Sequence, residues 1–167
     1  MSPSTLAFVR RPYQQLIRAA SLLQSPFLLA VRLFWGWQFF QTGRGKLLNH
    51  GDVTGFFASL HIPFPGLNAW LVGTVECIGG IFLLLGLASR LTAIPLSITL
   101  IVAYLTDGID TVKNIFSDPD KFTGATPFLF LFASLLVLIF GPGVFSLDHL
   151  LAKFSEEPKS NTRPKTQ

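Results

Sequence analysis

The sequence is poor in cysteine and in charge. Cys77 is the single cysteine among 167 residues, so the chain can form no intrachain disulfide and has no Cys-x-x-Cys motif. Thiol oxidases that pass electrons from cysteine pairs to a quinone are thereby excluded. Charged residues make up 13% of the chain, against roughly 25% in soluble domains. Half of the residues are hydrophobic, and this composition predicts a membrane protein.

The sequence also lacks a recognisable metal motif. His50, Asp52 and His61 share one predicted loop, but their spacing matches no metal site and no fourth ligand is evident. The acidic stretch 107–125 lacks the glycine and terminal glutamate of an EF-hand loop, so a solvated turn is the better interpretation. We therefore expect no metal site.

The sequence contains long apolar runs. About 20 apolar residues at 1.5 Å per residue cross a hydrocarbon core of ~30 Å. Three segments reach this length and a fourth, 91–106, is shorter, and the sequence predicts an all-α integral membrane four-helix bundle as a domain over 26–151. The predicted spans are 26–47, 67–87, 91–106 and 126–145.

The two flanking segments are polar or amphipathic. Residues 1–25 fit either an amphipathic helix on the cytoplasmic surface or an extension of the first span. Residues 152–167 contain prolines and few apolar side chains, which predicts a disordered cytoplasmic tail.

The basic residues predict the orientation. Four spans place both termini on one side, and that side holds eight basic residues against four on the other, with Arg32 set aside as intramembrane. The positive-inside rule then predicts that both termini are cytoplasmic. Basic residues at helix ends and in tails also argue against a nucleic-acid partner. The eight are Arg10, Arg11, Arg18, Arg90, Lys153, Lys159, Arg163 and Lys165.

Glu76 is the residue that most needs an explanation, because it is the lone acidic residue inside a predicted span. A carboxylate near the bilayer midplane is costly unless it is neutral, paired or beside water. Arg32 lies ~9 Å away along the membrane normal by residue count, so a direct pair is within reach only with helix tilt. A protonated Glu76, a water-mediated link to Arg32 and a purely structural contact between helices all remain open.

Small residues share helix faces with these charges. Such positions let membrane helices approach closely, so we expect helix packing there and, through exposed glycine faces, self-association into a homo-oligomer. The expected packing residues are Gly36, Gly43, Gly73 and Gly80.

Several of these residues form a pattern that resembles the DoxX family of small four-span membrane proteins, over about residues 27–150. The family resemblance implies a four-helix membrane fold, located in the bacterial plasma (inner) membrane. The matching residues are Arg32, Gly36, Gly43-x-x-Lys46-Leu47, Ile62-Pro63-x-Pro65 and Glu76-x-x-Gly79-Gly80-x-x-Leu83-Leu84-Leu85-Gly86-Leu87-x-x-Arg90.

The resemblance further implies a redox role. Family members are associated with membrane redox complexes, one of them quinone-linked, so the chain is expected to act as an oxidoreductase subunit, with soluble redox partner proteins, and not as a self-sufficient enzyme. Glu76, Arg32, Lys46 and Arg90 would then shape an internal polar pocket with a quinone as the candidate cofactor. No catalytic residue is assigned. A scaffold protein without chemistry and a small proton-linked transporter are the alternatives.

Overall fold

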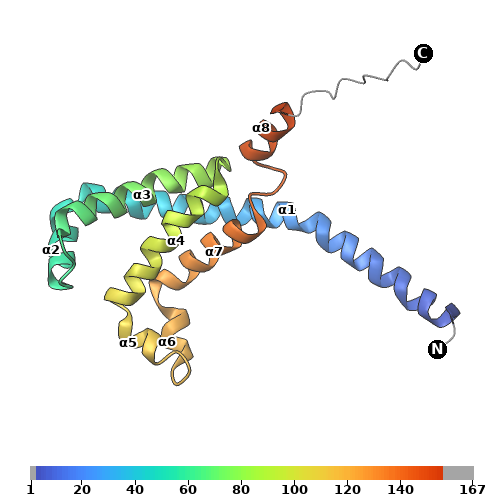
Figure 1. Cartoon of the computed structure of the whole chain (residues 1–167), viewed down its shortest axis with the longest axis horizontal. Coiled ribbons are helices and arrows are strands. Elements are labelled where there is room, and N and C mark those ends of the chain that lie inside the picture. Colours follow the sequence, from blue (N-terminus) through green and yellow to red (C-terminus); the bar gives the residue numbers. More distant parts are fainter. Residues whose placement is uncertain (1–2, 156–167) are drawn as a thin grey trace, which may run out of the picture.

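The computed structural model describes residues 3–155, and every regular element in that range is a helix. Four long or apolar helices form the body of the molecule, and four short ones connect or follow them (Figure 1). Their bounds are α1 Pro3–Leu48, α2 His50–Ser59, α3 Pro65–Leu85, α4 Ser89–Thr106, α5 Ile109–Lys113, α6 Pro119–Gly124, α7 Thr126–Phe140 and α8 Leu147–Ser155.

The first helix is longer than the span predicted for it. The segment before Pro26 continues into the span as one uninterrupted helix, which is the extension that the sequence offered as one of two alternatives. Residues 13–24 are exposed on every side, and this half of α1 projects away from the other helices (Figure 1). Packing begins at Leu28, the first buried side chain of the described chain.

Helices α1 and α3 pack antiparallel through glycines. A Cβ added to Gly43 would overlap the backbone of Cys77, and one added to Gly80 would overlap the backbone of Phe40. A Cβ added to Gly36 would lie 3.0 Å from the backbone of Gly80 and Leu84, and one added to Gly73 would meet the Leu47 side chain at 2.9 Å. The contacts therefore run in opposite directions along the two helices: each residue further along α1 faces a residue one position earlier in α3. All four glycines expected at packing faces lie in this contact, where small residues allow close backbone approach.

Helices α4 and α7 form a second pair that completes the core. The Ser97 and Ser134 hydroxyls are hydrogen-bonded across the pair at 2.8 Å, away from solvent. Such a contact satisfies two polar groups that would be costly alone in an apolar interior. The apolar core around it consists of Phe39, Leu83, Leu96, Leu100 and Val137.

The helices define an all-α membrane bundle. The described residues contain three helical stretches that are long and apolar enough to cross a membrane: 13–48, 65–85 and 89–106. The fourth, α7, is apolar but has 15 residues, because Gly141-Pro142-Gly143 ends it before the predicted limit of 145. It covers ~22 Å as a helix.

The C-terminal part is more ordered than the sequence suggested. The predicted disordered tail begins at 152, whereas α8 continues to Ser155. The remaining residues of that tail, 156–167, lie outside the described residues. The predicted boundary cut through an apolar repeat whose i, i+3, i+4, i+7 spacing is typical of an amphipathic helix.

Candidate functional site

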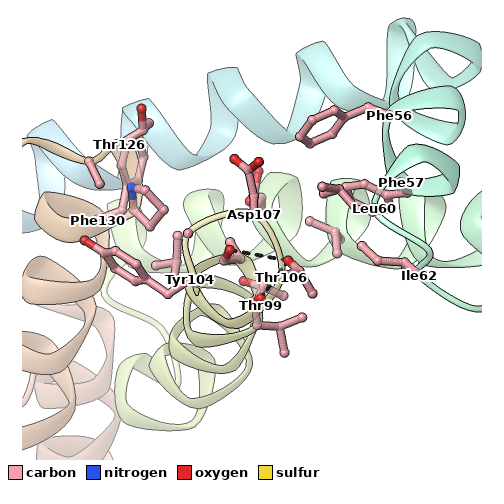
Figure 2. A pocket seen from close by; sticks show the side chains of 18 of the residues that line it. Phe56, Phe57, Leu60, Ile62, Thr99, Tyr104, Thr106, Asp107, Thr126 and Phe130 are labelled. Carbon is pink, nitrogen blue, oxygen red and sulfur yellow. Dashed lines mark hydrogen bonds between the residues drawn. The ribbon is translucent and has the colours of Figure 1, made fainter. Parts of the chain in front are cut away.

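A pocket of about 540 Å³ opens between the helices of the bundle. It lies among α1, α2, α3, α4 and α7, at the end of α4 that leads into α5 (Figure 2). Most of its wall is apolar, with aromatic and aliphatic side chains from α2 and α7. Volumes of roughly 300–1,000 Å³ with few polar groups are usual for sites that bind small molecules.

Lys46 and Glu76 form an ion pair in the wall of this pocket. The Lys46 ammonium donates hydrogen bonds to both carboxylate oxygens of Glu76, at 2.6 and 2.5 Å. The Glu76 side chain is 5% exposed, whereas the Lys46 side chain is 32% exposed. The carboxylate is thus satisfied by one cation, and the cation is the member of the pair that reaches the open part of the pocket.

The glycine contact between α1 and α3 explains why these two residues meet. Gly43 lies against the backbone at Glu76 and Cys77, so the two helix axes are close at this level. Lys46 follows Gly43 by three residues and shares its face of α1. The two side chains therefore meet across a short gap.

The Lys46 ammonium can donate one hydrogen bond more than it makes. A lysine ammonium carries three N–H groups, and Glu76 accepts two of them. The third has no acceptor among the described side chains and backbone groups around it. A ligand oxygen in the pocket could accept it.

The opening of the pocket combines aromatic side chains with an acid. Phe56 and Phe57 of α2 and Leu60, which directly follows that helix, line one side, and Asp107, which directly follows α4, lies across from them (Figure 2). Asp107 is exposed, and the described residues form no ion pair with it. The entrance is apolar on one side and negative on the other.

Arg32 is not in this pocket, and the direct or water-mediated link to Glu76 considered from the sequence is not formed. The α1–α3 register places Arg32 level with position 88, which is 12 residues or ~18 Å from Glu76 along α3. Its guanidinium instead donates to the backbone carbonyl of Phe145 at 2.6 Å. Arg32 is 1% exposed, and a Cβ at Gly86 would overlap it.

Arg90, the fourth residue expected in the pocket, lies on the outside of the bundle. Its guanidinium is exposed and donates to the Ile139 carbonyl at 3.3 Å, near the end of α7. Of the four expected pocket residues, the structure brings Lys46 and Glu76 together, whereas Arg32 and Arg90 lie near the α3–α4 turn.

A residue that the sequence reasoning missed, Asp148, organises that turn. Its carboxylate accepts hydrogen bonds from the backbone N–H groups of Ala88 and Ser89 at 2.6 and 2.9 Å. Its own N–H donates to the Gly86 carbonyl at 2.9 Å. An acid here satisfies the first N–H groups of α4 and faces the positive end of its dipole. The cap comes from 60 residues further along the chain, so no local signal could reveal it.

The residues considered for metal binding do not gather. The described residues contain no group of three or more His, Cys, Asp or Glu side chains suited to a metal. His50 instead has its Nε2 atom 3.0 Å from the Gly66 carbonyl, and its ring lies beside that of Trp70. These contacts tie α2 to the start of α3.

An all-α membrane bundle with a ligand-sized pocket around one ion pair is the class of protein that these features define. Comparison with family models then assigns it more narrowly: the DoxX model matches residues 27–107, and the chain belongs to the DoxX family.

Three relatives are similar along most of their length. An uncharacterized membrane protein of Mycobacterium tuberculosis is 31% identical over 77% of this chain and 83% of its own. An uncharacterized protein of Haemophilus influenzae is 28% identical over 75% and 83%. A candidate oxidoreductase of Bacillus subtilis, called CatD, is 28% identical over 75% and 87%. No solved structure matches the chain.

Proposed function

We propose that this protein is the membrane subunit of a redox complex and that its pocket binds a quinone-class molecule. The observation that carries the proposal is the pocket of about 540 Å³ whose polar centre is the Lys46–Glu76 pair. A quinone needs an apolar slot for its ring and a donor for a carbonyl oxygen, and the third Lys46 N–H is such a donor.

The charges of the pocket favour a neutral ligand. Lys46 and Glu76 cancel each other, and Asp107 adds a negative charge at the entrance. An anionic ligand would be repelled there and would have to compete with Glu76 for the ammonium. A quinone is uncharged, so Asp107 does not repel it, and its carbonyl oxygen can accept a hydrogen bond from Lys46 without displacing Glu76.

The chain's own residues would bind and orient the ligand but would not supply electrons. In this proposal the electrons come from a partner protein, because the single cysteine of the chain cannot form a redox-active disulfide within it. The name of CatD, an oxidoreductase candidate, supports a redox setting for this chain as well. The bacterial inner membrane is the location that accompanies this proposal.

The proposal is tested by binding of a short-tailed naphthoquinone to the purified full chain in lipid nanodiscs, by equilibrium dialysis. We expect saturable binding that Lys46→Met weakens at least tenfold, because the donor to the ligand oxygen is lost. Lys113→Met removes the same charge from an exposed position outside the pocket and should leave binding unchanged.

A second pair of variants tests whether quinone binding requires the pocket. Ala103→Phe adds a ring to the pocket wall and should abolish binding, whereas Ile101→Phe adds bulk on an exposed face of the same helix and should not. Equal binding by all four variants, or no binding by the parent protein, would contradict the quinone proposal and favour the scaffold alternative.

A further inference from the structure

Helix α8 carries an apolar face that no described part of the protein covers. Its apolar side chains are 38–79% exposed. At 100° per residue they fall within an arc of about 100°. The opposite side of the helix carries Asp148, His149 and Lys153. The apolar residues are Leu147, Leu150, Leu151 and Phe154.

The start of α8 is fixed to the α3–α4 turn. Asp148 accepts from the N–H groups of Ala88 and Ser89, and its own N–H donates to the Gly86 carbonyl. The segment just before α8 is held as well, because the buried guanidinium of Arg32 donates to the Phe145 carbonyl. These bonds fasten α8 to α1, α3 and α4 at one place.

That place lies at a membrane surface. Helices α3 and α4 are both long and apolar enough to cross the membrane, and three residues, 86–88, join them. A turn this short between two antiparallel membrane helices has to lie at the surface of the bilayer. A helix pinned to the turn therefore begins at the same surface, and Figure 1 shows α8 beyond the junction of α3 and α4.

We propose that α8 is an interfacial helix whose apolar face lies on the lipid bilayer. The occupant of that face is the boundary between lipid headgroups and acyl chains on the side of the α3–α4 turn. A strongly amphipathic helix of low net hydrophobicity is the kind that lies in this plane. Lys153 on its polar face and the exposed Arg90 beside the turn would attract anionic headgroups.

The test is a spin-label scan of α8 in the full chain, reconstituted in vesicles of phosphatidylethanolamine and phosphatidylglycerol. Cys77→Ala removes the native thiol, and single cysteines replace Leu150, Phe154, His149 and Lys153 in turn. We expect labels at 150 and 154 to collide more with oxygen, which concentrates in lipid, than with a water-soluble nickel complex. Labels at 149 and 153 should show the reverse.

Two outcomes would overturn the proposal. High access of the nickel complex at all four positions would mean that α8 stands in water. Low access of both relaxants at 150 and 154 would mean that a protein, such as a second copy of the chain, covers the face.

A matched pair of charge substitutions tests the same point, with the label at position 150 as the readout. Phe154→Glu places a carboxylate on the apolar face and should raise nickel access at 150 severalfold. Ser155→Glu adds the same charge one residue away, toward the polar side, and should not. Because neither variant touches the bundle, both should melt like the Cys77→Ala parent. If both variants changed nickel access equally, or neither did, α8 would not be lipid-bound.

Discussion

At the scale of single residues, Lys46 and Glu76 differ in solvent exposure. The Glu76 side chain is 5% exposed and the Lys46 side chain 32% exposed. Removing one member of a buried ion pair costs about 3–5 kcal/mol, since an uncompensated charge remains. The cost should fall mainly on the variant that leaves the carboxylate alone, because the ammonium can reach water by itself.

We therefore expect Lys46→Met to destabilise the protein more than Glu76→Gln. The glutamine keeps two polar atoms at the same place, so its cost should be near the 1–3 kcal/mol of one altered buried polar group. Thermal unfolding in mild detergent measures the difference, and Lys113→Met at an exposed site is the control for loss of charge. Equal melting temperatures for Lys46→Met and Glu76→Gln would contradict this account of the pair.

Glu76→Leu tests whether the Lys46–Glu76 pair is needed for stability and for ligand binding. It removes the carboxylate entirely, so Lys46 loses both of its acceptors. Both variants should weaken quinone binding, and Glu76→Leu should lower the stability of the protein more than Glu76→Gln does. A Glu76→Leu protein that matched the parent in both respects would show that the pair is not central to the pocket.

At the scale of helices, the α1–α3 contact depends on the absence of side chains at four positions. Gly43→Ala should destabilise the bundle strongly, because the new methyl group would overlap the backbone of Cys77 and force the helices apart. Gly45→Ala, two residues along the same helix, has open space around its added Cβ. Its change in melting temperature should be small, or positive through the better helix propensity of alanine.

The two alanine variants are compared by melting temperature and by naphthoquinone binding in nanodiscs. Gly43 also sets the distance between α1 and Glu76, so Gly43→Ala should weaken binding even where the protein remains folded. If Gly43→Ala and Gly45→Ala behaved alike, the close approach of α1 to α3 would not hold the pocket together.

The sequence predicted the helices better than the contacts between them. Apolar run length predicted the four principal helices, three of which are long and apolar enough to cross a membrane, and the glycines expected at packing faces all lie between α1 and α3. The partner of Glu76 was missed because residue counting left Arg32 within reach of Glu76 only if the helices tilt, whereas the antiparallel register excludes that pair. Asp148 was missed because its hydrogen bonds join segments far apart in the chain, which composition and periodicity cannot detect.

At the scale of the whole molecule, α7 decides on which side the C-terminal helix lies. Three other helical stretches satisfy the length requirement for crossing the membrane, while α7 covers ~22 Å of a ~30 Å core. The apolar residues Val144 and Phe145 follow it after the Gly-Pro-Gly break. Together with local thinning of the bilayer, they would let the chain complete a fourth crossing and bring α8 back to the side of the α3–α4 turn.

The orientation of the molecule determines where the pocket opens. The pocket is lined by the N-terminal half of α3 and the C-terminal half of α4, so it lies toward the membrane face opposite the α3–α4 turn. If both termini are cytoplasmic, as the eight basic residues on that side predict, the pocket opens away from the cytoplasm. A water-soluble redox partner that reaches the ligand through the opening would then act on the outer face.

Labelling of single cysteines in intact cells tests this arrangement. In the Cys77→Ala background, we expect Ser117→Cys, at an exposed position of the loop between α5 and α6, to react with a membrane-impermeant maleimide. Ser155→Cys at the end of α8 should react only after the cells are permeabilised. Labelling of Ser155→Cys from outside, with Ser117→Cys protected, would invert the molecule and turn the pocket toward the cytoplasm. Labelling of both in intact cells would mean that α7 does not cross, because an odd number of crossings places the loop and α8 on one side.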